Sequence, residues 1–324
     1  MARQLHLPLE LILQIVEASL PTGGPQFVID VSAPEAQLLV AWSQVCRATY
    51  DPATRLLRQH CMYIDSVPRL RKLLGCLSAS KSYSSTSTLQ PTISLGTISS
   101  IYLGLPKDTI PGPEVGPLMR DLFIELGSSI RRLILDLPYC TLPQDNIQPD
   151  CNQQLSEGLS ALNNVEEFVT VGGLPTIDFW EDGTDFWERW PRLRRLAAFH
   201  VLLAEEALWH NIARTRALEQ MVLARSLLLR VPKWNFKHAI GQHWSLKLGG
   251  DPTLERRMNI LLADHEFSPP IIDATEAEIH DPQGLVSVSS FAVPIRGTTF
   301  VRTDHACREW MVKAAKEGTL WGHE

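Results

Sequence analysis

Four histidines in one part of the chain are the first candidates for chemistry. They are His200, His210, His238 and His243. A metal site or an acid–base site needs ligands that converge, and none of these histidines forms a His-x-x-x-His pair. We therefore interpret them as surface or half-buried side chains. A hydrolase that uses His200 or His210 is the weakest of three functional alternatives.

Six cysteines are scattered along the chain without a Cys-x-x-Cys pair: Cys46, Cys61, Cys76, Cys140, Cys151 and Cys307. This scatter is typical of reduced thiols and not of a zinc site or a disulfide framework. The sequence also has no nucleophile elbow, phosphate-binding glycine loop or dinucleotide fingerprint. We expect no catalytic residue, no metal and no cofactor, and hence a protein that is not an enzyme.

A segment at residues 179–190 carries three tryptophans and four acidic residues. Aromatic side chains of this kind often supply binding energy at interfaces, and the acids would attract a basic partner. The other interpretation, which we prefer, is that the rings seal the outer layer of the fold while the acids face water.

The composition predicts a folded protein without nucleic-acid or membrane partners. The 324 residues are 44% hydrophobic and 20% charged, as in ordinary globular proteins. The net charge of −6 opposes binding to nucleic-acid phosphates. No window approaches 18 apolar residues, and the N-terminus lacks the uninterrupted apolar stretch of a signal peptide. We expect a cytoplasmic or nuclear location.

The elements that position the side chains follow a repeated template, apolar-x-x-apolar-x-apolar. Its copies begin at Ile98, Ile130, Val165, Leu193 and Leu218, at intervals of 32, 35, 28 and 25 residues. Apolar residues at helical spacing occupy residues 114–128, 150–163 and 205–216 between the copies. We place a degenerate sixth copy at Gly241, Trp244 and Leu246.

Each unit is thus a strand with a return helix, and stacking the units builds a continuous core. The predicted fold class is α/β, a solenoid with a parallel sheet and outer helices. The template resembles irregular leucine-rich repeats, although the asparagine typical of that family after the strand is missing. The resemblance implies a parallel sheet that lines a concave face.

Alternation along the strands predicts which side chains point into that concave face. If the template residues face the core, the intervening ones line the groove. The proposed target-binding residues are Tyr102, Arg132, Asp136, Glu167, Arg195, Phe199 and Gln220. Apolar side chains beside both signs of charge suit a protein or peptide partner better than nucleic acid.

The N-terminal residues predict a module of three short amphipathic helices. Leu7, Leu11 and Ile15 recur every four residues along a first helix, from about residue 8 to residue 20. Residues 32–35 have the form of a capping box for a second helix, and residues 51–52 repeat the start signal for a third. The apolar stripe on the first helix requires a partner surface.

This module resembles an F-box in three places: Leu-Pro-x-Glu-Leu at residues 7–11, the leucine pair at 38–39, and Val-Cys-Arg at 45–47. Residues 21–37 make a longer connection than the family's usual turn. The resemblance implies docking on the Skp-type adaptor of a cullin ubiquitin ligase. The positions it assigns to adaptor binding are Leu7, Pro8, Leu11, Ile12, Ile15, Leu38, Leu39 and Val45.

We predict four segments: an F-box-like module at residues 1–77, a serine-rich linker at 78–94, a repeat domain at 95–250 and a C-terminal capping region at 251–324. Within the last segment, the apolar spacing of Ala306, Trp310 and residues 312–314 predicts a closing helix at residues 303–317. The predicted function is recognition of a protein substrate for a Skp-cullin-F-box type ligase. The alternative is a stand-alone interaction scaffold whose N-terminal helices only cap the solenoid.

Overall fold

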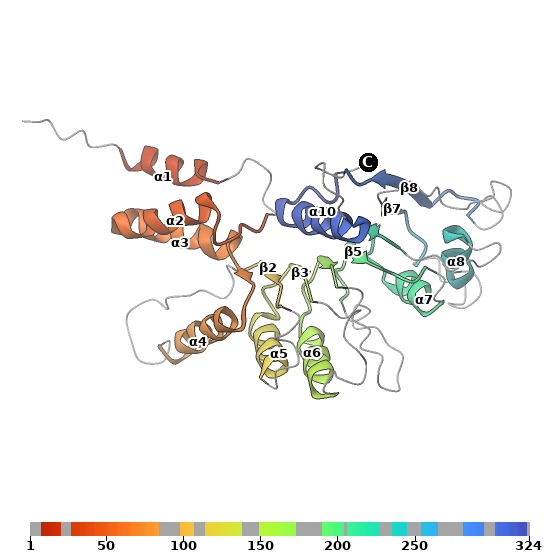
Figure 1. The fold of residues 1–324 in the computed structure, drawn as a ribbon, viewed down its shortest axis with the longest axis horizontal. Coiled ribbons are helices and arrows are strands. Elements are labelled where there is room, and N and C mark those ends of the chain that lie inside the picture. Colours follow the sequence, from red (N-terminus) through yellow and green to blue (C-terminus); the bar gives the residue numbers. More distant parts are fainter. Residues whose placement is uncertain are drawn as a thin grey trace, which may run out of the picture.

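One parallel β-sheet organises the chain (Figure 1). The computed structural model describes residues 8–20, 27–83, 98–106, 114–137, 149–172, 190–203, 206–226, 235–244, 254–264, 281–294 and 302–322. Within these residues, eight strands follow one another in the order β1 to β8, and every neighbouring pair is parallel. The fold is α/β, with strands and helices that succeed one another as in a solenoid.

The strands are β1 (Tyr63–Ile64), β2 (Ser100–Leu103), β3 (Arg132–Leu135), β4 (Glu167–Thr170), β5 (Arg195–Phe199), β6 (Gln220–Ala224), β7 (Met258–Asp264) and β8 (Val286–Ala292). The helices are α1 (Leu9–Ala18), α2 (Pro34–Val45), α3 (Arg47–His60), α4 (Val67–Tyr83), α5 (Val115–Leu126), α6 (Pro149–Ser160), α7 (Glu206–Arg214), α8 (Phe236–Gln242) and α10 (Thr303–Glu317). Helices α4 to α8 lie on one side of the sheet and α10 lies on the other (Figure 1).

The strand register confirms the predicted repeat intervals. Ser100 lies opposite Arg132, 32 residues on, and the next three pairings add 35, 28 and 25 residues. The template residues of these strands are buried in one large core with α4 to α8. A parallel sheet needs both faces covered, and these helices cover the first of them, here called the outer face.

Helix α10 covers the second, inner face. Its bounds agree with the helix expected at this place in the sequence, and Cys307 and Met311 on it are fully buried. They pack in a second apolar cluster with inner-face residues such as Ile134, Val169 and Val222. The C-terminal region, predicted as a cap, thus contributes β7 and β8 to the end of the sheet and places α10 over its inner face.

Helices α1, α2 and α3 form a module with a small core of its own. That core contains Val16, Phe27, Ile29, Ala36, Leu39, Ala53, Leu56 and Cys61. The backbone N–H of Val28 donates to the carbonyl of Lys316 at 2.7 Å, and Lys316 lies in the last turn of α10. Since α3 also leads directly into β1, the module is connected both to the sheet and to α10.

Some element boundaries differ from the prediction. Ser32 does not cap α2, because its hydroxyl donates to the nearby Asp30 carboxylate. Helix α3 begins four residues before the predicted start, and Pro52 lies inside it, where it removes one backbone donor. Helix α4 continues to Tyr83, beyond the module boundary predicted at residue 77.

The predicted sixth copy of the template is wrong. Gly241 lies in α8 and Trp244 follows that helix, while Leu246 lies outside the described residues. Trp244 is buried and its indole N–H donates to the carbonyl of Ala213, so it packs α8 against α7. The strand after β6 is β7, in which Asn259 lies opposite a residue 39 positions earlier.

None of the described helices combines the length and the apolar character that crossing a bilayer would require.

Candidate functional site

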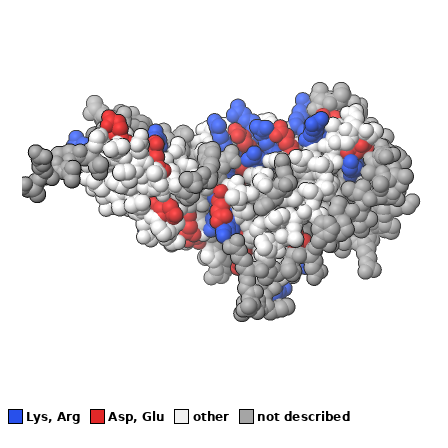
Figure 2. All heavy atoms as spheres, turned by 90° about the horizontal axis from the view of Figure 1, so that it is seen from above, with Lys and Arg blue, Asp and Glu red and all other residues white. Residues whose placement is uncertain are grey.

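Apolar side chains assigned to adaptor docking stand exposed on α1 and α2. We call four of them the adaptor surface: Leu11 (44% exposed), Ile15 (43%), Leu38 (45%) and Val45 (63%). Pro8, directly before α1, is also exposed. Figure 2 shows mostly uncharged side chains on the side of this module that faces the viewer, with several separate acidic and basic side chains among them. Leu11 and Ile15 lie four residues apart on α1, and Leu38 and Val45 lie seven residues apart on α2, so each pair shares one face of its helix. Exposed apolar side chains that share a helix face are typical of a surface that a partner covers.

The remaining adaptor positions are placed differently. Leu39 is fully buried in the core of the module, so it supports α2 from inside. Ile12 is half-buried, and Leu7 lies outside the described residues. On α1 the fully buried side chain is Val16. The helix thus turns Val16 inward and Leu11 and Ile15 outward.

The open groove predicted for the inner face is not there, because α10 occupies most of it. Five of the proposed target-binding residues are buried: Tyr102, Arg132, Asp136, Glu167 and Phe199. Arg195 and Gln220 are only partly buried. Alternation along the strands correctly separated the two faces of the sheet, but the inner face is covered by the chain itself.

Buried charges on the inner face are paired with one another and with α10. The Arg132 guanidinium donates to the Glu167 carboxylate at 2.5 Å and also to the backbone carbonyl of Ala315. Arg195 lies 3.7 Å from the same carboxylate. A buried charge without a partner is costly, so this network favours one position for the end of α10.

A second polar group fixes α10 near β2 and β3. The Tyr102 hydroxyl donates to Asp136 at 2.8 Å, and Arg308 of α10 donates to the other oxygen of that carboxylate at 2.5 Å. Burial, and secondly the negative charge of Asp136, raise the pKa of Tyr102 far above its ordinary value. The ammonium group of Lys316 lies over the rings of Tyr63 and Tyr102, at 5.3 and 5.8 Å.

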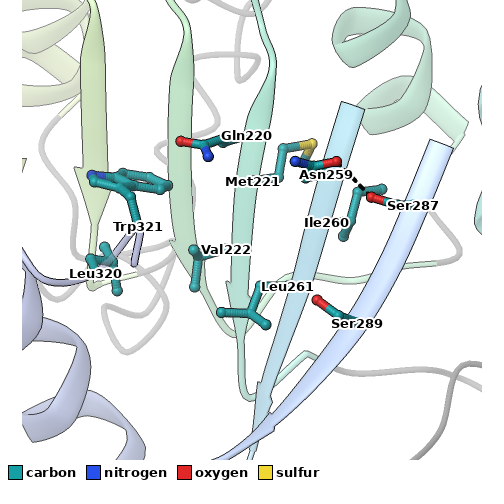
Figure 3. A pocket seen from close by; sticks show the side chains of 10 residues that line it. All are labelled: Gln220, Met221, Val222, Asn259, Ile260, Leu261, Ser287, Ser289, Leu320 and Trp321. Atoms are coloured by element: carbon teal, nitrogen blue, oxygen red, sulfur yellow. Dashed lines mark hydrogen bonds between the residues drawn. The ribbon is translucent and has the colours of Figure 1, made fainter. Parts of the chain in front are cut away.

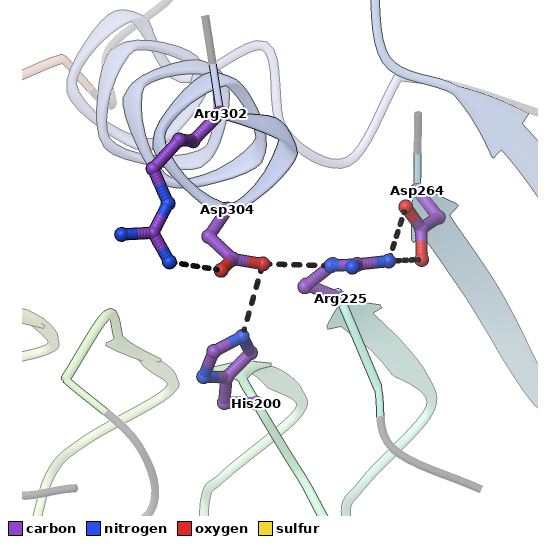
Figure 4. Close-up of polar contacts among 5 residues, drawn as sticks. All are labelled: His200, Arg225, Asp264, Arg302 and Asp304. Atoms are coloured by element: carbon purple, nitrogen blue, oxygen red, sulfur yellow. Dashed lines mark hydrogen bonds and ion pairs between the residues drawn. The ribbon is translucent and has the colours of Figure 1, made fainter. Parts of the chain in front are cut away.

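Asp304 in the first turn of α10 lies among two arginines and a histidine (Figure 4). It accepts a hydrogen bond from Arg225 at 2.8 Å and lies 3.5 Å from His200 and 3.8 Å from Arg302. Arg225 also contacts Asp264 at 3.0 Å. The hydrogen bond from Arg225 lowers the pKa of Asp304 and outweighs burial, which acts in the opposite direction.

Two residues of this cluster have left-handed backbones. His200 has a φ of 57° and Arg225 a φ of 51°, and each directly follows its strand. Side chains other than glycine rarely adopt this conformation, and the strain costs about 1–3 kcal/mol per residue. The turn directs both side chains toward Asp304, and these contacts hold the start of α10 in place.

Beside the end of α10 the inner face is hollowed (Figure 3). We call this cavity of about 290 Å³ the β6–β8 hollow. Ten residues line it: Gln220, Met221, Val222, Asn259, Ile260, Leu261, Ser287, Ser289, Leu320 and Trp321. Of these ten, Gln220 alone was a predicted target-binding residue, because the repeat template did not extend to β7, β8 or the turn after α10.

Within the described residues, the histidines and cysteines belong to no group of three or more side chains that could hold a metal ion. His210 and His243 contact each other through their Nδ1 atoms at 3.3 Å, and burial, followed by the charge of His210, lowers the pKa of His243. Cys61 and Cys307 are buried and are not in a disulfide, and burial raises the pKa of Cys61 to about 12. Neither arrangement activates a nucleophile.

Trp190 is the part of the aromatic, acidic segment that the structure describes. Its ring is fully buried, meets Phe168 edge to face at 5.0 Å, and donates its indole N–H to the carbonyl of Leu159 at 3.1 Å. This ring seals the outer layer, as one of the two interpretations expects. The other residues of the segment, 179–189, lie outside the described part of the chain.

Comparisons with known proteins identify no relative: no family model matches the sequence, and neither the curated proteins nor the solved structures yield a match.

Proposed function

We propose that this chain is the substrate-recognition subunit of a Skp-cullin-F-box type ubiquitin ligase. In this proposal the α1–α3 module is an F-box-like module that docks on the adaptor, and the sheet is an irregular leucine-rich-repeat-like domain that presents the target. The chain would act by proximity, holding a target lysine near ubiquitin on the ligase, and would contribute no catalytic residue.

One observation carries the proposal: the adaptor surface is exposed although the module has a core of its own. Leu38 and Leu39 are adjacent in the sequence, yet the first is 45% exposed and the second is fully buried. The buried leucine holds α2 on α3, which leaves its neighbour available to a partner. Burying an aliphatic side chain of this size contributes about 1.5–3 kcal/mol, so a few such side chains can support a stable complex.

The test is co-purification of the full chain with a purified Skp-type adaptor. The double variant Leu11→Asp and Ile15→Asp places two charges on the adaptor surface and should abolish the complex. Ile124→Asp is the matched control, since Ile124 is a 52% exposed apolar residue on α5, outside the module. The control should bind the adaptor like the natural chain.

The stand-alone scaffold is the second candidate, and one observation favours it. The module is hydrogen-bonded to α10 through Val28 and Lys316, as expected of helices that cap a neighbouring domain. Failure of the natural chain to bind the adaptor, with the folded state intact by circular dichroism, would support the scaffold and refute the ligase proposal.

A further inference from the structure

The sheet ends at β8 with an open edge (Figure 1). Among the described residues, β7 is the only strand that pairs with β8. Proteins usually protect such an edge with a charged side chain, a proline or a very short strand. The opposite edge is protected in this way, because β1 has two residues, but β8 has seven residues without a charge or a proline. All of them except Val286 are exposed or partly exposed, so the rest of the chain does not bury this strand.

The backbone groups that remain open on β8 follow from its bonds to β7. The N–H of Met258 in β7 donates to the carbonyl of Leu285 at 2.9 Å. At the other end, the N–H of Val293 donates to the carbonyl of Asp264 at 2.8 Å. Alternate residues of a strand bond to opposite neighbours, so every second residue of β8 directs its N–H and C=O groups away from β7. Within the described part of the chain, three of these residues have no backbone partner: Val288, Ser290 and Ala292.

No further backbone donor is open at either end of this stretch. Before it, the N–H of Val286 already donates to the Asp281 carboxylate at 3.0 Å. Asp281 is buried and is held by Lys237 at 2.9 Å. After it, Pro294 has no N–H to donate. The open donors of β8 are thus limited to three alternate residues, with Ser290 at the centre.

We propose that β8 pairs antiparallel with the β8 strand of a second copy of this chain, about a two-fold axis at Ser290. Facing residues exchange two backbone bonds at the axis and at one pair on either side of it, about six bonds in all. The two sheets then join into one continuous sheet across the interface. This inference goes beyond the proposed function and does not depend on it.

The side chains of β8 favour a second copy as the partner strand. In this register Val288 faces Ala292 of the second copy, so that a larger side chain meets a smaller one. Phe291 likewise faces Ser289, and Ser290 faces itself. Like charges directly opposite each other would destabilise the pairing, and β8 has none. A second copy also brings an open stretch of the same length with the same two ends, which a strand of unrelated sequence would match only by chance.

The test measures the mass of the purified full chain by sedimentation velocity. The natural chain should sediment as a dimer, with twice the mass of one chain. Ser290→Pro removes the N–H at the axis without removing a bond to β7, and it should sediment as a monomer. Ser290→Thr is the matched control, since it keeps the N–H group and suits a strand, and it should remain dimeric.

A second substitution keeps the test decisive if the proline variant does not fold, as judged by circular dichroism. Ser290→Lys places two ammonium groups opposite each other at the axis. It should weaken the dimer about fivefold or more at low salt concentration. High salt concentration should restore part of the loss, because it screens the repulsion.

A disulfide tests the register of the two strands. Facing residues of a hydrogen-bonded antiparallel pair have Cα atoms about 5.5 Å apart, which a disulfide can span. Ser290→Cys should therefore give a dimer crosslinked through that position on mild oxidation, as identified by mass spectrometry. Ser287→Cys is the control, because its two copies would lie about 20 Å apart along the paired strands, and it should form no such crosslink.

Three results would overturn the inference. A natural chain that is monomeric at about 100 μM would exclude a second copy as the partner of β8, whatever other strand pairs there. A dimer that persists in both Ser290→Pro and Ser290→Lys would place the interface elsewhere. A dimer of Ser290→Cys that forms no disulfide at that position would refute the register. Adaptor co-purification of Ser290→Pro should be unchanged, so failure of this inference and failure of the ligase proposal are distinguishable.

Discussion

Two surfaces of this chain were predicted to bind partners, and the structure leaves one open and covers the other. The adaptor surface on α1 and α2 exposes its apolar side chains, whereas the inner face of the sheet is packed under α10. The two surfaces also differ in chemistry. The adaptor surface is apolar, while the inner face contains buried ion pairs such as that of Arg132 with Glu167.

This difference shows that a segment of the same chain can cover a strand face that the sequence pattern predicts to be exposed. Charged residues that alternate with apolar ones along a strand predict a solvated or partner-binding face. Here α10 is the partner, and its carbonyl at Ala315 and its Arg308 side chain supply the complementary groups. The exposed face of α10 carries both signs of charge (Figure 2), as expected of a helix that faces water.

The largest effect on stability is expected when one member of the buried ion pair on the inner face is removed. Glu167→Ala should lower the free energy of unfolding by about 3–5 kcal/mol, because the buried Arg132 guanidinium loses its carboxylate. Glu166→Ala is the control: Glu166 pairs with Arg131 at an exposed site, and its loss should cost about 1 kcal/mol or less. Urea denaturation measures both, and equal losses would show that α10 does not bury the charges.

Leu38 and Leu39 on α2 test the same contrast, between an exposed and a buried side chain, within the module. Leu39→Ala should cost about 2–5 kcal/mol of unfolding free energy because it leaves a cavity, whereas Leu38→Ala should change stability by about 0.5 kcal/mol or less. Binding to the adaptor should show the reverse order, with Leu38→Ala affecting it directly. Similar unfolding midpoints for the two variants would contradict the burial described here.

A smaller effect is expected at the start of α10. Asp304→Ala removes the contacts with Arg225 and His200 and, as the site is about one-third exposed, should cost about 1 kcal/mol or less. The folded-state pKa of Asp304 is lowered, so its contribution is present above the ordinary pKa of 3.8 and is lost as the pH falls below it. Denaturation at pH 6 and pH 3 measures this, and the variant should lose less stability on acidification than the natural chain.

The smallest effect is a pH dependence near neutrality. Burial lowers the folded-state pKa of both His60 and His243 from 6.5, so the unfolded chain binds more protons in this range. Stability should therefore fall as the pH drops below about 6.5. His243→Gln and His60→Gln should each remove part of the slope between pH 7 and pH 5; a steeper slope in either variant would contradict the assignment.

Much of the sheet could be predicted from the sequence, and the limits have physical causes. Strands β2 to β6 follow the template closely enough that its intervals equal the register offsets. Strand β1 has only two residues, too few for a period to be visible. Strand β7 was missed because the apolar spacing around Trp244 fits a helix as well as a strand, and α8 is the outcome.

The candidate site was less predictable because it depends on contacts between distant segments. The bounds of α10 followed from its apolar spacing, but that spacing does not reveal which surface the helix covers. Ser289 and Trp321 lie outside the repeats and meet Gln220 only once the chain is folded. On α1 the stripe was recognised, yet the division into buried Val16 and exposed Leu11 required the neighbouring helices.

Hydrogen–deuterium exchange of the full chain, with and without a purified Skp-type adaptor, tests the central claim most directly. The adaptor should slow exchange in α1 and α2, where the exposed apolar side chains lie, and leave α10 and the sheet unchanged. Unchanged exchange in α1 and α2 at saturating adaptor, or protection confined to α10, would contradict the account.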